Sequence, residues 1–215
     1  MSELLTQYIE AQLAGDRFEA VRVVTAKGLF VGVAAEDLYL DVVGPAQEKL
    51  GQLWETNRIS VADEHQGTFI SQLVLAQLYP HLGRAPRNGW SAVVACVDGE
   101  MHDMAARMAS DFLEAAGFYV QLLGADVPTS ALVSHLTRHR PDLIALSATM
   151  PFNLPALQQT IIQLRQTCGH GMPIIAGGFL KNATPELAPE LLVHASSGTA
   201  RDLVALVQRL LGAPP

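Results

Sequence analysis

A histidine with a carboxylate two residues before it directly follows an apolar run of the sequence. Glu100 and His102 lie in the segment Gly99-Glu100-Met101-His102-Asp103, which comes after the apolar run 91–97. A carboxylate can accept a hydrogen bond from one ring nitrogen, which fixes the tautomer and makes the other nitrogen a better ligand or base. The pair therefore predicts a site for a metal or a metal-containing cofactor. A histidine that caps a helix beside a solvated carboxylate is the alternative that these residues leave open.

Short polar and small residues end two later apolar runs. Ser147 and Thr149 close the run 143–148, and the pair Gly177-Gly178 closes the next. Hydroxyl groups at such positions can bond ligand nitrogens or oxygens, although they also end strands for local reasons. Two glycines let a backbone approach a bulky ligand or turn with positive φ. We treat these residues as candidates for the same site as His102, with ordinary turns as the alternative.

The elements that would bring these candidates together are the strands of a parallel sheet. After residue 90, short apolar runs alternate with helical patterns. The expected strands are 91–97, 118–123, 143–148, 173–177 and 191–195, and the expected helices are 103–116, 129–139, 154–167 and 199–211. This alternation predicts a doubly wound, flavodoxin-like (Rossmann-like) α/β domain with five parallel strands. Such sheets bind ligands at the carboxyl ends of their strands, where the candidates lie.

The first part of the chain has helical apolar spacing throughout and predicts a four-helix bundle. The expected helices are 2–14, 16–29, 34–55 and 61–81. Pro45 falls inside the third, so that helix is expected to kink or to restart at Gly44-Pro45. Ser60, with Asp63 three residues later, is a start signal for the fourth. The stretch 83–89 suits a linker, which gives two domains, 1–83 and 90–215.

The composition excludes several classes of protein. The 215 residues are 49% hydrophobic and 16% charged, with a net charge of -7. Direct nucleic-acid binding is not expected, because the basic residues are scattered on an acidic background. The sequence has no signal peptide pattern and no run of 18 apolar residues, which argues against a membrane protein. The two cysteines lack framework spacing, so they are expected to be free thiols in the cytoplasm.

Together, the strand-end residues of the second domain resemble the cobalamin-binding domain of corrinoid proteins. The family pattern is D/E-x-H-x-x-G, then a strand-end Ser with Thr or Leu two residues on, then a Gly-Gly pair. The matching segments are Glu100 to Ala105, Ser147-Ala148-Thr149 and Gly177-Gly178. The resemblance implies that His102 is the lower axial ligand of cobalt, with Asp103 beside it, and that the nucleotide tail of the cofactor passes Ser147, Thr149 and the glycines. This chain departs from the pattern in having Glu100 where most members have Asp, and Ala105 in place of Gly.

The helical domain resembles a narrower group, the cobalamin-dependent light-sensing regulators. Trp54, nine intervening residues and then Glu64-His65 match their W-x9-E-H signature. In that family a four-helix bundle covers the upper face of the corrin. The resemblance implies that Trp54 packs on the upper axial group, that Glu64 hydrogen-bonds the adenosyl group and that His65 supports the same pocket. The alternative from the residues alone is a core tryptophan and an exposed first helical turn.

The resemblance implies a sensor that binds adenosylcobalamin and has no catalytic residues. Light-driven loss of the adenosyl group would change the association of the protein with itself, as a homo-oligomer, or with a separate output protein. The sequence begins at the bundle, so we expect a sensor without the DNA-binding domain of its relatives. Glu55 replaces the histidine that follows the tryptophan in some relatives, which leaves His65 as a substitute upper ligand.

Three alternatives stay open at this point. The first is the enzymatic one, a corrinoid subunit that carries methyl groups between methyltransferases, although a bulky Trp54 above the cobalt argues against it. The second is the same sensor with a bilin such as biliverdin as an additional chromophore. The third is a flavodoxin-like domain that binds some other cofactor.

Overall fold

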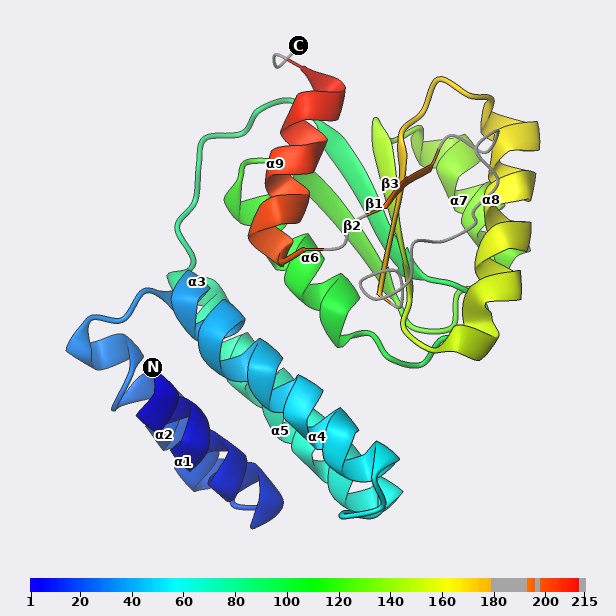
Figure 1. Ribbon diagram of the computed structural model, residues 1–215. Helices are drawn as coiled ribbons and strands as arrows, with labels where there is room; N and C mark the ends of the chain where they lie inside the picture. The colour runs from blue at the N-terminus through cyan, green and yellow to red at the C-terminus, as the bar shows by residue number, and fades with distance from the viewer. Residues whose placement is uncertain (179–192, 196–197, 213–215) are drawn as a thin grey trace. The chain divides into compact units, whose positions relative to one another are not determined.

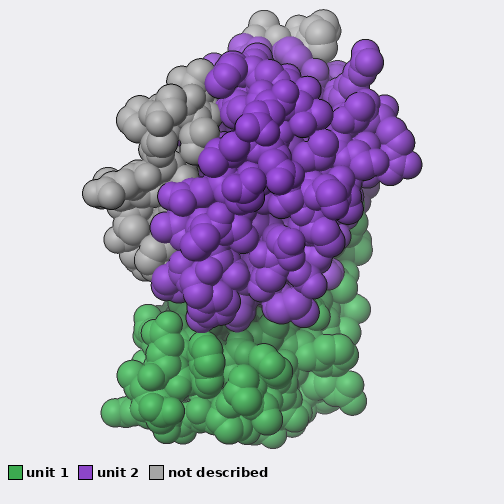
Figure 2. Space-filling model, turned by 90° about the vertical axis from the view of Figure 1, so that its right-hand side faces the viewer, with its two compact units in different colours: residues 1–83 green, residues 84–215 purple. Residues whose placement is uncertain are grey.

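The structure is a computed structural model that describes residues 1–178, 193–195 and 198–212. The chain forms two compact units, Met1–Gly83 and Arg84–Pro215 (Figure 2). Each unit has its own buried core and is described by itself.

The first unit is made of helices. Its longer helices are α1 (Ser2–Leu13), α2 (Arg17–Thr25), α4 (Gly44–Glu55) and α5 (Val61–Leu78), and its short turns are η1 (Leu29–Val31), α3 (Ala35–Leu38), η2 (Tyr39–Val43) and η3 (Tyr79–His81). The side chain of Asp16 accepts a hydrogen bond from the Glu19 N–H and caps α2. The predicted helix 16–29 was too long, since α2 ends at Thr25. Gly28 leaves helical geometry, with φ of -111° and ψ of -82°.

The predicted helix 34–55 is divided into three consecutive segments. A π-helical turn over Tyr39–Val43 joins α3 to α4, which starts at Gly44 and holds Pro45 in its first turn. Because a proline has no N–H to donate, the first turn of a helix is where it costs least. The expectation of a new segment at Gly44-Pro45 is therefore confirmed.

Helix α5 begins with a full capping box. The Ser60 hydroxyl accepts from the Asp63 N–H, and the Asp63 carboxylate accepts from the Ser60 N–H at 2.9 Å. Further along α5, Gly67 packs against α4 so closely that an added Cβ would lie 2.4 Å from Leu50 Cδ1. The bundle core fills with fully buried side chains, among them Tyr8, Leu38, Tyr39, Leu50, Ile70 and Leu78.

The second unit is the predicted doubly wound domain, with a five-stranded parallel sheet (Figure 1). The strands are β1 (Ser91–Cys96), β2 (Tyr119–Gly124), β3 (Leu143–Ala148), β4 (Ile174–Gly178) and β5 (Val193–Ala195), and their order is β2-β1-β3-β4-β5. The helices are α6 (Met104–Ala115), α7 (Thr129–His139), α8 (Leu154–Cys168), preceded by the turn η4 (Pro151–Asn153), and α9 (Ala200–Leu211). Residues 191 and 192 of the predicted last strand lie outside the described residues.

Helices cover both faces of this sheet. Helices α7 and α8 pack on one face and α6 and α9 on the other (Figure 1). Alternate residues of β1 serve the two faces: Val93 and Ala95 belong to the first core, and Val94 and Cys96 to the second. Because both faces are buried, these strands are apolar along their whole length, which is why they were recognisable in the sequence.

The strand order reverses between β1 and β3, and sheets of this kind bind their ligands at the carboxyl edge beside such a reversal. Cys96 of β1 pairs with Ser147 of β3, and Ser147 pairs with Gly177 of β4. The loops that follow these strands therefore leave the sheet side by side. Among the described residues, no helix has both the length and the apolar character needed to cross a membrane.

Candidate cofactor site

The loop after β1 is folded around the carboxylate of Glu100, which is completely buried. Its Oε1 accepts hydrogen bonds from His102 Nδ1 at 2.6 Å and from the His102 backbone N–H at 2.9 Å. The structure thus brings together the two residues that the sequence paired.

The other carboxylate oxygen holds the loop after β3. Glu100 Oε2 accepts from the backbone N–H groups of Thr149 at 2.6 Å and Met150 at 3.0 Å, and from Asn153 Nδ2 at 3.0 Å. One carboxylate therefore joins the loop after β1 to the loop after β3. The sequence analysis did not identify Asn153 as a site residue. It lies more than fifty positions from Glu100, and an asparagine at this place is also explained by the frequent use of asparagine at helix starts.

Glu100 is held as an anion despite its burial. Burial by itself raises the pKa of a carboxyl group, but the hydrogen bonds from His102, Asn153 and Met150 outweigh it and lower the pKa of Glu100 to about 2. An ionised carboxylate only accepts hydrogen bonds, so the proton of the shared bond belongs to His102 Nδ1. In the neutral imidazole the lone pair is then on Nε2, the nitrogen that would coordinate a metal.

The His102 ring is accessible to solvent, whereas the Glu100 carboxylate that orients it is buried. The His102 side chain is 43% exposed and that of Glu100 is 0% exposed. Among the described residues, no group of three or more histidine, cysteine or acidic side chains could hold a metal ion. An exposed imidazole nitrogen is able to coordinate the metal of a cofactor that carries other ligands of its own.

A buried hydroxyl lies next to this histidine loop. Ser147 Oγ is buried and, among the described residues, lacks a hydrogen bond of ordinary length and angle. The Cys96 thiol lies close to it, but a thiol is a weak partner, and this one donates to the His102 carbonyl at 3.6 Å. A buried hydroxyl without a good partner is costly, and a ligand atom that bonds it would remove that cost.

The end of β4 allows a very close backbone approach. Gly178 has φ of +93°, and an added Cβ would lie 2.4 Å from the Ala148 carbonyl oxygen. Only glycine fits such a position. Gly177 stands beside Ser147 in the sheet register, so the predicted Ser147 and Gly-Gly elements share one edge.

Two large apolar side chains of the loops after β1 and β3 are exposed. Met101 is 67% exposed and Phe152, in η4, is 70% exposed. Ala105, which departs from the family pattern, is exposed in the first turn of α6. Asp103 is the first-turn neighbour of Arg107, with 4.0 Å between Oδ2 and Nη2.

The remaining predicted residues lie in the helical unit. Glu64 is buried in the first turns of α5, and its Oε2 accepts from His65 Nδ1 at 2.8 Å. The His65 side chain is 72% exposed. Trp54 is half-buried near the end of α4. Gln47 and Thr68, which the sequence did not single out, bond the other oxygen of Glu64 at 3.2 and 2.7 Å.

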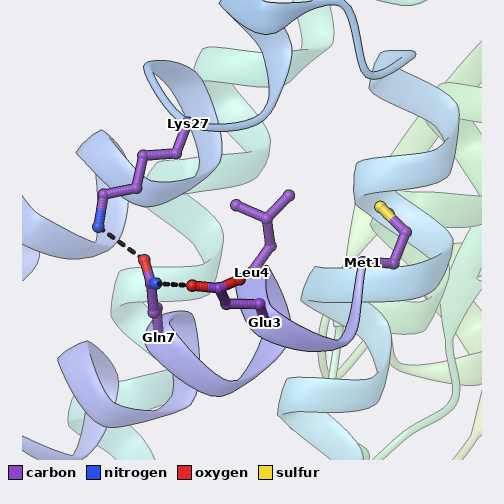
Figure 3. A pocket seen from close by; sticks show the side chains of 5 residues that line it. All are labelled: Met1, Glu3, Leu4, Gln7 and Lys27. Atoms are coloured by element: carbon purple, nitrogen blue, oxygen red, sulfur yellow. Dashed lines mark hydrogen bonds between the residues drawn. The ribbon is translucent and has the colours of Figure 1, made fainter.

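A separate hollow of about 300 Å³ lies at the start of the chain (Figure 3). It is lined by Met1, Glu3, Leu4, Gln7 and Lys27. Gln7 Nε2 donates to Glu3 at 3.1 Å, and Lys27 Nζ donates to Gln7 Oε1 at 2.6 Å. Because these polar groups already satisfy one another, we regard the hollow as a packing feature.

Comparison with known families gives two matches along the chain. The pattern of the B12 binding domain family matches residues 90–207, and a second B12 binding domain pattern matches residues 4–79. The two matches cover the sheet unit and the helical unit in turn.

Individual relatives are of two kinds. The chain is 32% identical over 162 residues to the HTH-type transcriptional repressor CarH of Myxococcus xanthus, covering 74% of this chain and 52% of that protein. It is 32% identical over 117 residues to dimethylamine corrinoid protein 1 of Methanosarcina acetivorans, covering 54% of each. The chain thus spans about half the length of these curated relatives.

Among solved structures, the monomethylamine corrinoid protein of Methanosarcina barkeri has a similar fold. Its TM-score is 0.85 with 18% sequence identity, over 97% of this chain and 99% of that one. At this identity the likeness concerns the fold.

Proposed function

The chain belongs to the B12 binding domain family, and from this premise we propose that it is a light-responsive sensor that binds adenosylcobalamin with His102 as the lower cobalt ligand. The observation that carries the proposal is the Glu100–His102 pair, in which a buried anion holds Nδ1 and directs the lone pair to Nε2. A carboxylate in this role orients the ring and makes it a stronger ligand.

Features of the sheet unit support the fit of a corrin and its nucleotide tail. The exposed side chains of Met101 and Phe152, in the loops after β1 and β3, would offer apolar surface to the corrin. Ser147 Oγ has an unused hydrogen bond for the tail, and the close approach at Gly178 keeps side-chain atoms out of that edge. In this proposal Ser147, Thr149 and the Gly177-Gly178 pair line the path of the tail.

The helical unit would supply the cover for the upper face. Trp54 would pack on the upper axial group, Glu64 would accept a hydrogen bond from it and His65 would complete the pocket. When bound, adenosylcobalamin supplies a cobalt–carbon bond that light can break. A ligand shifts a protein between states only if its contacts differ in the two, and Trp54 and Glu64 are where we place that difference.

The test compares the protein loaded with adenosylcobalamin before and after green light. We expect a photolysis spectrum together with a changed elution volume on a sizing column, because loss of the adenosyl group would alter self-association. The His102→Ala variant should lose the spectrum of histidine-ligated cobalamin. Complete photolysis with an unchanged elution volume would exclude the switch and leave binding intact. Expression with biliverdin would report a second chromophore by a red absorbance band.

A methyl-carrying corrinoid subunit is the second candidate, favoured by the similarity to the dimethylamine corrinoid proteins. That role needs access to the cobalt from above, and the protein would then exchange methyl groups with a partner methyltransferase. Transfer of methyl groups from methylcobalamin on this protein to a thiol acceptor, without any response to light in the adenosyl form, would favour the carrier over the sensor.

A further inference from the structure

The helical unit buries a carboxylate that the helix itself does not need. Asp63 already completes the capping box of α5, yet the next residue, Glu64, turns inward, and its side chain is only 11% exposed. Among the described residues its only ion-pair partner is His65, which lies largely in solvent. A buried carboxylate held mainly by neutral donors is a poor source of stability. Its position therefore points to a ligand.

A chain of hydrogen bonds runs from α1 through α5 to α4. Gln12 Nε2 donates to Ser71 Oγ at 2.8 Å, and Ser71 Oγ donates to Gln47 Oε1 at 3.1 Å. A hydroxyl has one proton, so Ser71 must accept the third bond, from the Tyr8 hydroxyl, at 3.1 Å. All three of Ser71's hydrogen-bonding positions are thereby used, and Ser71 is fully buried.

This arrangement fixes which way the Gln47 amide points. Its oxygen is taken by the Ser71 hydroxyl, so its nitrogen faces Glu64 Oε1 at 3.2 Å and also the Thr68 hydroxyl, which is very close. Thr68 in turn donates to the same carboxylate oxygen at 2.7 Å. Every bond in the chain is directed toward the carboxylate, and bonds aligned in this way reinforce one another.

We propose that Gln47 is a positioning residue that, with Thr68, holds Glu64 as a fixed hydrogen-bond acceptor and so makes the protein select cobalamins whose upper axial group carries hydroxyl donors. The inference rests on the proposed cobalamin binding and adds the basis of selectivity. A carboxylate accepts about four hydrogen bonds. Three are in place on Glu64, from Gln47, Thr68 and His65, so a further donor can be accepted. Trp54 lies seven residues after Gln47 on α4, on the same helix face.

The test is a titration of the full-length apoprotein in the dark with adenosylcobalamin, which has ribose hydroxyls, and with methylcobalamin, which has none. We expect Gln47→Met to weaken adenosylcobalamin binding by about ten-fold, as expected for one lost charge-assisted hydrogen bond, and methylcobalamin binding by less than about two-fold. Glu64→Gln should show the same selective loss, and the double variant should lose little more. Gln52→Met changes an exposed glutamine of the same helix and serves as the control.

The outcomes separate the inference from the proposed function. An equal loss for both cobalamins in Gln47→Met would make the chain of bonds purely structural and overturn the inference. The inference is also overturned if the wild-type protein binds adenosylcobalamin and methylcobalamin with equal affinity, although the proposed cobalamin binding would then stand. If it binds neither, the proposed function fails as well. Thr68→Val, similar in shape to threonine, repeats the test if Gln47→Met does not fold, which thermal unfolding of the apoprotein will show.

Discussion

At the scale of the residue, Glu100 is a fully buried carboxylate that is stabilised by hydrogen bonds from two loops. Its five hydrogen bonds come from His102, the backbone after β3 and Asn153. The charge they stabilise is absent once the carboxyl group is protonated. Protonation of this group should therefore contribute to the pH dependence of the stability of the sheet unit.

The sign of that dependence follows from the lowered pKa. Since the folded pKa of Glu100 is about 2 against an ordinary 4.5, its contribution is complete above pH 4.5 and is lost as pH falls toward 2. The loss is on the order of 3 kcal/mol. Urea unfolding at pH 6, 4 and 3 should show a decline in the free energy of unfolding, and Glu100→Gln should make that decline shallower. Asp98→Asn, an exposed carboxylate in the same loop, should leave it intact. An unchanged decline in Glu100→Gln would assign it to other groups.

Replacement of Ser147 gives a second prediction, in which the stability of the apoprotein and its cobalamin affinity change in different directions. Ser147→Ala removes a buried hydroxyl that lacks a good partner, so the melting temperature of the apoprotein should stay or rise. Cobalamin affinity should fall by about 1–2 kcal/mol, because the ligand loses its hydrogen bond. Ser91→Ala is the contrasting variant, since Ser91 Oγ donates to Asp142 at 2.7 Å. It should destabilise the apoprotein and spare affinity. A lower melting temperature for Ser147→Ala would contradict this account.

Residue pairs were predictable from the sequence only where their members are neighbours. Glu100 and His102 are two positions apart, so their spacing alone suggested the bond that the structure contains. Asn153 donates a hydrogen bond to Glu100 and Gln47 donates one to Glu64, and each pair is separated by more than fifteen positions in the sequence. Asparagine and glutamine are common on any surface, and no local pattern marks these two.

At the scale of the element, the contact between α4 and α5 depends on a glycine within a helix. Gly67→Ala would normally favour a helix by about 1 kcal/mol. Here the new methyl group would lie 2.4 Å from Leu50 Cδ1, inside a core where Leu50 has no exposed surface. We expect net destabilisation of about 1–2 kcal/mol, because overpacking outweighs propensity.

The matched variant for this contact is the double change Gly67→Ala with Leu50→Val, which makes room for the methyl group. Thermal unfolding of the single and double variants should show partial recovery. If Gly67→Ala alone is neutral, the helices can move apart freely and the contact is not tight.

Elements were predictable where one periodicity holds along their length. The strands of the sheet are buried on both faces and stood out as apolar runs, and their alternation with helices gave the topology. The end of α2 at Thr25 was not predictable in the same way. The apolar spacing continues past it, whereas the chain forms a turn over residues 26–28 and has left helical geometry at Gly28.

At the scale of the whole molecule, the two units have separate cores within one chain. Units with independent cores can unfold independently, and a ligand stabilises only what it binds. We expect the apoprotein to unfold in two calorimetric transitions and the adenosylcobalamin complex in one at higher temperature, if the cofactor contacts both units. A shift of one transition alone would mean that only one unit binds it.

The hydrogen bonds of Glu100 are present in the polypeptide alone, and this has a thermodynamic consequence for cofactor uptake. They tie the loops after β1 and β3 together and orient the ring of His102 without a contribution from a ligand atom. Little conformational entropy then remains to be lost in forming this half of the site. We therefore expect the affinity of this half of the site to be set mainly by the contacts made with the ligand.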